Sequence, residues 1–301
     1  MINLISISGG KDSTATVLLA LEREVENMRF VFCDTGNESY HTIRYIQYLS
    51  NFLESKTGQC IEFLRADDQL SEKLLKKADK LDKEDPRKEC LKLVAFSNHP
   101  AFLKLAVLKG RFPSTMARFC TTELKINLIK SRIKSILNDG DDVDNWSGVR
   151  ADESPHRAKL PEREFFFSDE ETGAEAWHYR PILQWKADDC FDIMKRFGVE
   201  PNPLYKMGFA RVGCFPCVNC RKEELRLIAD KFPYIIRKIK EWEEIVGDAS
   251  MRGKSTFFPI TSDRDGILDE VEWSKTSRGG RQYQLDLEET TTCKSVYGLC
   301  E

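Results

Sequence analysis

Short apolar segments alternate with amphipathic segments along the first part of the chain. Residues 2–8 (INLISIS), 29–34 (RFVFCD) and 60–66 (CIEFLRA) are apolar and rich in β-branched or aromatic side chains, which predicts three buried strands. Between these segments, residues 14–25 and 43–53 carry apolar side chains at helical spacing. Strands that alternate with helices favour a parallel twisted sheet covered by helices, so the predicted fold class is α/β.

Beyond residue 67 the helical period continues, but polar and Pro-containing segments interrupt it. Residues 80–90 (KLDKEDPRKEC) predict a surface loop or mobile flap, and residues 123–137 predict a further helix. Residues 145–154 (NWSGVRADES) return to a strand that ends in polar side chains. We therefore predict a sheet domain over residues 1–200, followed by a smaller, mostly helical and cysteine-rich region over residues 201–301.

Composition and charge narrow the classes of partner. The chain has 301 residues, of which 41% are hydrophobic and 32% are charged, as expected of a globular protein. The net charge of -3 gives no general attraction for nucleic acid, so a nucleic-acid partner would need a local patch. No apolar run predicts a membrane span and no secretory leader pattern is present, so we expect a cytoplasmic protein without a membrane partner. The sequence does not predict an oligomeric state.

The stretch SISGGKDST, residues 6–14, lies between the first strand and the first helix. Two adjacent glycines permit a sharp turn that directs backbone N–H groups and the positive end of a helix dipole at an anion. The spacing differs from the usual G-x-x-x-x-G-K-[ST] loop, and Asp12 is suited to hold Mg²⁺. The predicted pyrophosphate-binding residues are Ser8, Gly9, Gly10, Lys11, Asp12 and Ser13.

This stretch resembles the PP-loop of the adenine nucleotide alpha-hydrolase superfamily, in its phosphoadenosine phosphosulfate (PAPS) reductase-like branch. CDTGNES (33–39) is similar to the DTG-x-E segment of that branch, and GVRADESPHR (148–157) is similar to its G-x-R-x-x-E-S-x-x-R segment. YRPILQW (179–185), followed by Asp188, looks like the segment that usually comes next. The resemblance implies a Rossmann-like fold and further nucleotide contacts from Asp34, Thr35, Glu38, Gly148, Arg150, Glu153 and Arg157.

Two arginines of the 148–157 segment carry chemistry of their own. Arg150 and Arg157 are candidates for bidentate contact with phosphate or sulfate oxygens. The alternative for each is a surface salt bridge with Asp152 or Glu153, and for Arg157 the two interpretations are equally supported.

The chain contains ten cysteines, which in a reducing compartment indicate metal ligation or redox chemistry. Cys214, Cys217 and Cys220 follow one another at Cys-x-x-Cys spacings, and Cys120 in RFCTTELK is a candidate fourth ligand. Cys120 also precedes a predicted helix, whose dipole would lower the pKa of its thiol. Four thiolates suit a 4Fe-4S cluster or a structural Zn²⁺, and spacing does not decide between them. Resemblance to iron–sulfur members of the branch, such as the enzyme that inserts sulfur into the DNA backbone, favours the cluster, with zinc as the alternative.

Two more cysteines lie near the end of the sequence, Cys293 and Cys300 in CKSVYGLCE. Assimilatory sulfonucleotide reductases carry a catalytic cysteine on a mobile C-terminal tail, and YGLC loosely resembles that tail. Cys300 is therefore a candidate catalytic thiol, and an ordinary terminal cysteine is the equal alternative.

The intact Gly-Gly-Lys-Asp-Ser pattern separates the candidate functions, because the resemblance implies that sulfonucleotide reductases have typically lost it. We expect an ATP-dependent, adenylating sulfur-transfer enzyme that forms AMP and pyrophosphate, with ATP, Mg²⁺ and a cysteine-ligated cluster as cofactors. A sulfur donor such as a cysteine desulfurase would be its partner, and the acceptor could be a nucleic acid. The alternatives are a PAPS or adenylylsulfate reductase and a nucleotide-binding subunit with a structural metal cluster. The candidate catalytic residues are Lys11, Asp12, Arg150 and Cys300.

Overall fold

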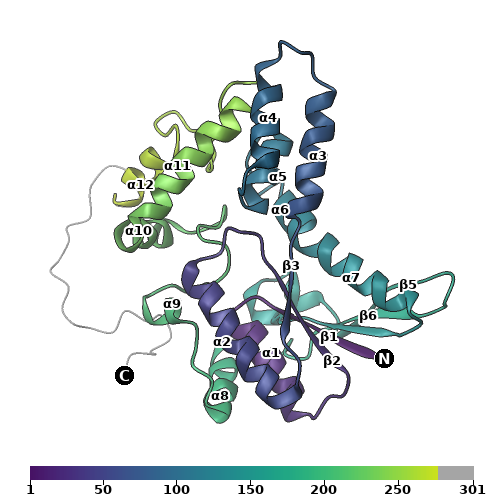
Figure 1. Ribbon diagram of the computed structural model, residues 1–301. Helices are drawn as coiled ribbons and strands as arrows, with labels where there is room; N and C mark the ends of the chain where they lie inside the picture. Colours follow the sequence, from purple (N-terminus) through teal and green to yellow (C-terminus); the bar gives the residue numbers. More distant parts are fainter. Residues whose placement is uncertain (277–301) are drawn as a thin grey trace.

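A six-stranded sheet with helices on both faces forms the base of the computed structural model, which describes residues 1–276 (Figure 1). The strands are β1 (Ile2–Ile7), β2 (Met28–Cys33), β3 (Ile61–Leu64), β4 (Val143–Trp146), β5 (Arg163–Ser168) and β6 (Glu175–Tyr179). Their order is β3-β2-β1-β4-β6-β5, and neighbouring strands are parallel except β5, which is antiparallel to β6. The predicted α/β class is confirmed, and the first three strands lie where the apolar segments predict them.

Helices account for most of the remaining described chain. The longer ones are α1 (Lys11–Glu22), α2 (Tyr40–Thr57), α3 (Asp67–Asp79), α4 (Pro86–Phe96), α5 (Ala101–Lys109), α7 (Asn127–Asn138), α8 (Ala187–Phe197), α10 (Lys222–Lys231), α11 (Pro233–Asp248) and α12 (Ile267–Ser274). The short ones are α6 (Phe119–Thr121), the π-helix η1 (Thr122–Ile126), the 3₁₀ turns η2 (Ala151–Glu153) and η3 (Arg157–Lys159), and α9 (Pro203–Lys206).

The two faces of the sheet bury different residues of the same strand. Ile5 and Ile7 of β1 pack in one cluster with residues of α1, α2 and α8, whereas Ile2 and Leu4 pack in another cluster with residues of α7. Successive side chains of a strand point to opposite faces, and a buried parallel strand therefore needs apolar residues on both. The nearly continuous apolar run at residues 2–7 follows from this double burial.

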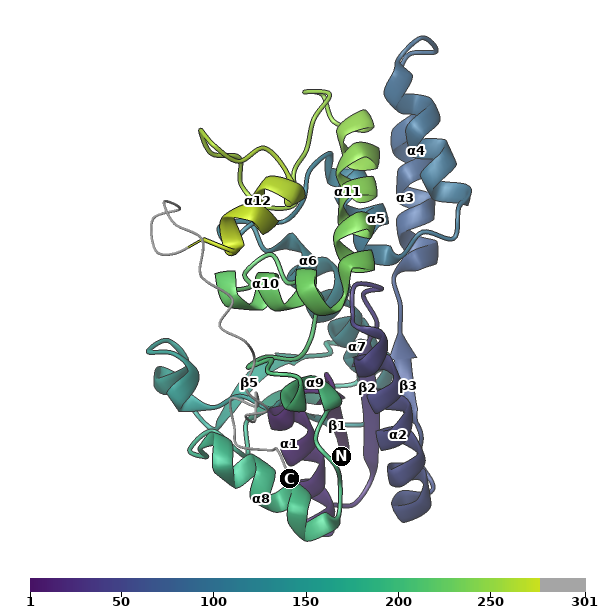
Figure 2. The same cartoon turned by 90° about the vertical axis from the view of Figure 1, so that its left-hand side faces the viewer.

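A separate group of helices lies beyond the carboxyl edge of the sheet. Figures 1 and 2 show α3, α4 and α5 beside α10, α11 and α12, with the sheet and its helices α1, α2 and α8 below them. One hydrophobic cluster joins the two sets, and in it Phe102 of α5 stacks on Trp242 of α11 with ring centroids 5.8 Å apart. The division predicted near residue 200 stays a prediction, and residues on both sides of it contribute to this cluster.

The loop predicted over residues 80–90 is shorter than expected. Helix α4 begins at Pro86, inside the segment that the sequence predicts as a loop or flap. Proline is favoured in the first turn of a helix, and the Asp85 side chain accepts a hydrogen bond from the Arg87 N–H as a cap. The proline therefore starts a helix here, and that part of the prediction is wrong.

The sheet is also not wholly parallel. Strands β5 and β6 form a hairpin that places an antiparallel strand at one edge of the sheet. The sequence pattern of this region does not predict this hairpin. Asp169 closes the turn, because its carboxylate accepts hydrogen bonds from the Glu171 and Thr172 N–H groups.

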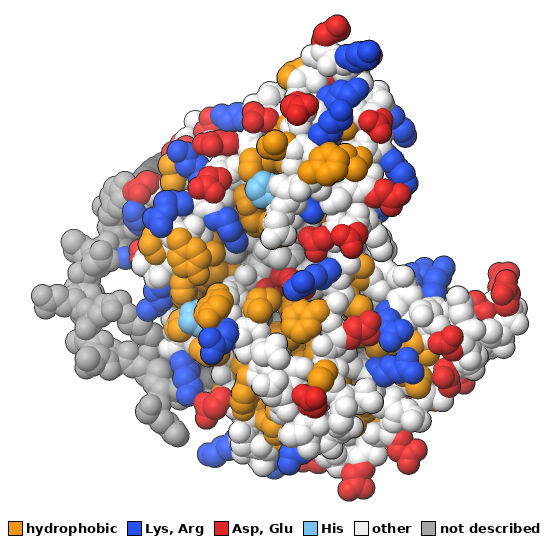
Figure 3. Space-filling view, in the orientation of Figure 1, with side chains coloured by type: hydrophobic (Ala, Val, Ile, Leu, Met, Phe, Trp, Pro, Cys, Tyr) orange, Lys and Arg blue, Asp and Glu red, His pale blue; other side chains and the backbone are white. Residues whose placement is uncertain are grey.

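The exposed side chains on the face in Figure 3 are mixed in charge, with Lys and Arg interspersed among Asp and Glu. This mixture agrees with the small net charge of -3. Within residues 1–276, none of the helices combines the length and the apolar character needed to cross a membrane.

Candidate nucleotide and sulfur site

The glycine turn after β1 is closed by its own hydroxyl groups. Gly9 has a φ of +75°, a conformation that strongly favours glycine. The Ser8 N–H donates to Ser13 Oγ at 3.0 Å, and Ser13 Oγ donates in turn to the Gly10 carbonyl at 3.0 Å. The turn and the first turn of α1 therefore form one rigid unit at the carboxyl edge of the sheet, where ligands bind in open α/β sheets.

Lys11, Asp12 and Arg150 meet at the start of α1. The Lys11 side chain is buried with Nζ 3.1 Å from Asp12 Oδ2, and Arg150 Nε lies 2.5 Å from Asp12 Oδ1. Arg150 also pairs with Asp152 at 2.7 Å, and although burial opposes its charge, Asp12 and Asp152 raise its pKa. Both carboxylate oxygens of Asp12 are thus engaged by cations, so Asp12 orients Lys11 and Arg150 in this arrangement.

Gly148 brings the end of β4 against the same turn. A Cβ atom at this position would lie 2.7 Å from the carbonyl carbon and oxygen of Asp12 and 2.8 Å from the Ser13 nitrogen. Real Cβ atoms do not approach backbone this closely, so a side chain at position 148 would displace the start of α1.

In the segment that follows β2, the side chains of Glu38 and Asp34 make contacts in different places. Glu38 turns back onto its own loop, accepting hydrogen bonds from the Thr35 N–H at 3.1 Å and from Thr35 Oγ1 at 2.8 Å. Burial raises the pKa of Glu38, and the charge of Lys125 acts against that shift. Asp34 instead accepts a hydrogen bond from Arg65 Nε at 2.8 Å, and it lines neither of the two openings described next.

A small opening of about 190 Å³, here called the inner cavity, lies where β1, β2 and β4 end. It is bounded by parts of all the predicted nucleotide segments and by one residue of η1. Its polar and glycine lining includes Ser8, Ser13, Glu38, Lys125, Gly148 and Gly213.

A larger opening of about 1160 Å³, here called the basic groove, lies beside the inner cavity. Predicted residues Glu153, at the end of η2, and Arg157, at the start of η3, line it and form an ion pair with each other. Burial, together with the charges of Arg211 and Arg150, lowers the pKa of Arg157. The cations that line the basic groove are Lys11, Arg118, Arg150, Arg157, Arg211 and Arg221.

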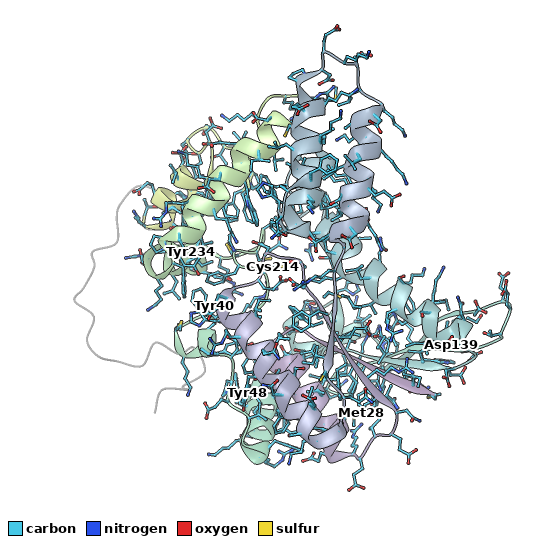
Figure 4. All side chains as sticks on the ribbon, in the orientation of Figure 1. Met28, Tyr40, Tyr48, Asp139, Cys214 and Tyr234 are labelled. Atoms are coloured by element: carbon cyan, nitrogen blue, oxygen red, sulfur yellow. The ribbon has the colours of Figure 1, made fainter. Side chains whose placement is uncertain are left out.

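The four candidate cysteine ligands come together although Cys120 is far from the others in sequence. Burial raises the pKa of Cys120, Cys214 and Cys220, in the case of Cys214 to about 11. Negative charge on Cys217 acts in the same direction on all three thiols, which shows that the four cysteines are close together. The expected lowering of the Cys120 pKa by a helix dipole is therefore wrong, because desolvation outweighs it. Figure 4 shows Cys214 between the sheet and the upper helices.

The four cysteines lie near one another, but their side chains do not surround a common metal position. Within residues 1–276, no three Cys, His, Asp or Glu side chains are arranged as a closed set of ligands for one metal ion. Cys300 lies outside the described residues, as does Cys293.

The cysteine segment is fastened to the Asp34–Ser39 loop. The Phe215 N–H donates to the Asn37 carbonyl at 2.6 Å, Asn37 Nδ2 donates to the Pro216 carbonyl at 2.9 Å, and Glu38 forms an antiparallel bridge with Cys214. These contacts place the cysteine segment directly beside Glu38, which lines the inner cavity.

Sequence reasoning missed residues that support the site from a distance. Asn202 is buried at the start of α9 and donates to the Gly9 carbonyl at 3.1 Å, and Tyr205 Oη accepts a hydrogen bond from the Lys11 N–H at 2.9 Å. The sequence Asn202-Pro203 is a helix-start signal, but it says nothing of what the helix touches. Lys125 was also missed; it lies on η1, and π-turns are frequent at functional sites.

Residues 2–220 match the family model described as the phosphoadenosine phosphosulfate reductase domain. The chain belongs to the PAPS reductase domain family. This membership confirms the resemblance that the glycine turn and its companion segments predict.

Within and around this family, relatives differ in how much of the chain they cover. The chain is 40% identical over 336 residues to an uncharacterized 37.8 kDa protein of Escherichia phage 186, covering 100% of this chain and 97% of the phage protein. It is 38% identical over 79 residues to adenosine 5'-phosphosulfate reductase of Burkholderia cepacia, covering 26% of this chain and 30% of that enzyme. PAPS reductase from Candida auris is structurally similar with a TM-score of 0.41 and 13% identity, over 71% of this chain and 82% of the other.

Proposed function

We propose that this PAPS reductase-family protein is an ATP-dependent adenylating enzyme that prepares an acceptor for sulfur transfer. The observation that carries the proposal is the intact turn in which Asp12 holds Lys11 at 3.1 Å and Arg150 at 2.5 Å. A preorganised pair of cations beside backbone N–H groups is suited to the charge that develops when a pyrophosphate leaves. Reduction of a bound sulfonucleotide releases no pyrophosphate, so it would not need Lys11 and Arg150 to stabilise that leaving group.

The chemistry is a displacement at the α-phosphorus of ATP. An oxygen of the acceptor forms a bond to that phosphorus, the bond between the α-phosphorus and the bridging oxygen breaks, and pyrophosphate leaves with the electron pair. Lys11 and Arg150 would stabilise the negative charge on the phosphates. Hydrosulfide then attacks the adenylated acceptor, the bond from the acceptor to the AMP oxygen breaks, and AMP leaves with the electron pair. Where a cysteine desulfurase is the donor it supplies the sulfur as a persulfide, and an external dithiol, oxidised to a disulfide, reduces that persulfide to hydrosulfide.

The arrangement of the two openings supports a placement for the nucleotide. Ser8 and Ser13 line the inner cavity, and Lys11 and Arg150 line the adjoining basic groove. The nucleoside would occupy the inner cavity, where Glu38 offers an acceptor to amino groups, and the phosphates would extend toward Lys11. Mg²⁺ would enter on the phosphate oxygens, and Asp12 would ligate it only by releasing Lys11.

Four thiols on two chain segments are a donor set that fits a thiolate-bound metal group. Cys120, Cys214, Cys217 and Cys220 would hold it, and a bound cation would offset the burial that raises the pKa of Cys120, Cys214 and Cys220. A single zinc needs four ligands around one point at about 2.3 Å, whereas a four-iron cluster holds its cysteines farther apart. The iron–sulfur members of the branch that the sequence resembles favour the cluster, which when bound would supply a site for sulfur or electrons.

One observation favours a second candidate, an adenylylsulfate reductase. The local identity of 38% over 79 residues is to an enzyme named for that activity. In that case the Cys300 thiolate would attack the sulfur of adenylylsulfate, the bond from that sulfur to the phosphate oxygen would break, and AMP would leave with the electron pair. Lys11 would contact the phosphate without any cleavage of ATP.

The deciding experiment assays anaerobically purified protein for pyrophosphate release from Mg-ATP and for thiol-dependent sulfite release from sulfonucleotides. We expect pyrophosphate release, and we expect Lys11→Ala to lower it by about 100-fold or more. Lys240→Ala, which removes an exposed lysine of α11, is the matched control and should leave the rate unchanged. Sulfite release without pyrophosphate would replace the proposal with the reductase, and nucleotide binding without either reaction would reject both enzymes.

Metal content is measured on the same preparations. We expect iron with a visible chromophore in the wild-type protein and its loss in Cys217→Ser. Zinc in place of iron, or a full iron complement in the variant, would contradict the cluster assignment.

A further inference from the structure

The basic groove contains three arginines in addition to the cations that are proposed to contact the phosphates of ATP. Arg118 lies before α6, Arg211 follows α9, and Arg221 immediately precedes α10, so three separate segments bring their side chains to one opening. Among the residues that the structure describes, no carboxylate lies within ion-pair distance of any of these three arginines. Arg118 Nε donates to the Thr115 carbonyl at 3.2 Å, which leaves its charge uncompensated.

The acidic residues of the groove do not neutralise it. Glu153 is already paired with Arg157, and Glu224 feels the charges of Arg211 and Arg221 without forming an ion pair with either. Like charges held together raise the energy of the empty groove and favour an anion that comes between them. The opening of about 1160 Å³ also exceeds the inner cavity of about 190 Å³ severalfold, so it has room for more than phosphates of ATP.

One buried polar atom lies at the wall of the groove. Asn219 lines the groove, and Asn219 Oδ1 is buried without a hydrogen-bond partner among residues 1–276. A buried polar atom without a partner is costly, and because Oδ1 is shielded from solvent it would accept from a ligand only after the Asn219 side chain turns toward the groove.

We propose that Arg118, Arg211 and Arg221 form a second anion subsite, which binds a phosphate group of the acceptor while ATP occupies the turn at Lys11. This inference rests on the proposed function, because it names the class of substrate that the adenylation would act on. Guanidinium groups bind phosphate oxygens in pairs of parallel hydrogen bonds, and Asn219 would accept a hydrogen bond from the same ligand once its side chain turns toward the groove. The acceptor is thus a phosphate ester, either a free phosphomonoester or the phosphodiester of a nucleic-acid strand.

The test measures binding of two probes that lack adenine, in the presence of saturating Mg²⁺ and α,β-methylene-ATP. A fluorescent oligothymidylate of about ten residues, followed by its anisotropy, represents the phosphodiester, and ribose 5-phosphate, titrated separately by calorimetry, represents the monoester. We expect the wild-type protein to bind at least one of them. Arg211→Ala/Arg221→Ala should weaken that binding at least tenfold and lower the salt slope of the oligonucleotide by about two.

Matched controls separate the subsite from general charge and from the nucleotide site. Arg237→Ala/Arg252→Ala removes the same charge from exposed residues outside the groove and should change probe affinity less than twofold. Arg211→Lys/Arg221→Lys keeps the charge without the paired geometry and should bind with intermediate affinity.

Two outcomes would overturn the proposal. One is the absence of binding of both probes to the wild-type protein at low salt, and the other is equal weakening in the groove variant and the exposed control. If the ATP analogue does not bind but the probes still bind through the arginines, the proposed function fails and the anion subsite stands.

Discussion

A methyl group at position 148 would lie 2.7 Å from the Asp12 backbone, which makes Gly148→Ala a direct test of how tightly β4 packs on the glycine turn. The backbone of Gly148 is not in the left-handed region, so lack of space alone excludes a side chain. We expect the free energy of unfolding to fall by about 1–3 kcal/mol, as for other overpacked sites. Affinity for Mg-ATP, measured by titration calorimetry, should also fall because Lys11 and Asp12 shift.

Gly247→Ala is the control for this substitution. Its added Cβ would meet neighbouring atoms at 3.5 Å or more, an ordinary contact, near the end of α11. Urea unfolding should show unchanged stability or a gain of up to about 1 kcal/mol, because alanine loses less backbone entropy than glycine. Equal losses in the two variants would mean that the close approach at Gly148 does not govern the site.

At the scale of the element, the short helix α9 acts as a support for the turn. Asn202 both caps α9, through its side-chain oxygen and the Leu204 N–H at 3.1 Å, and donates to the Gly9 carbonyl at 3.1 Å. We expect Asn202→Ala to lower the free energy of unfolding by about 1–3 kcal/mol and to weaken nucleotide binding as well. Chemical denaturation and nucleotide titration of one preparation check both effects.

A second cap, remote from the turn, provides the comparison for Asn202. Asp85 caps α4 through the Arg87 N–H at 3.0 Å and makes an ion pair with the Arg87 side chain. Asp85→Ala should therefore destabilise the fold to a similar extent but leave nucleotide affinity within twofold of the wild-type value. An Asn202 variant that loses stability and keeps its affinity would show that α9 does not position the turn.

At the scale of the whole molecule, the upper helices depend on residues from both sides of residue 200. Leu103 and Leu105 of α5 share one hydrophobic cluster with Ile239 and Val246 of α11. A fragment of residues 1–200 would expose the apolar face of α5 to water, so we expect it to bind hydrophobic dyes and to unfold without a cooperative transition. The full chain should unfold in a cooperative transition, as followed by circular dichroism. A cooperative unfolding transition of the 1–200 fragment would instead support the domain division near residue 200.

Much of the fold could be predicted because its signals are local. The apolar run at residues 2–7, the glycine pair after it and the helix that follows each depend on neighbours a few positions away. The same holds for the segments around Glu38 and Arg150, whose order along the chain identifies the family. The sequence also mispredicted locally where competing signals overlapped, as at Pro86, which starts a helix and does not extend a loop.

The sequence by itself determined the α/β class, the family and the residues of the glycine turn, because short-range periodicity and turn chemistry encode them. Only the tertiary structure decided which other distant residues meet: Tyr205 with Lys11, Asn202 with Gly9, and the three arginines of the basic groove. Such contacts follow from how buried apolar faces pack, and many residue pairs far apart in sequence satisfy the same local patterns. The raised pKa of Cys120 shows the same limit, because desolvation depends on surrounding atoms that no local motif names.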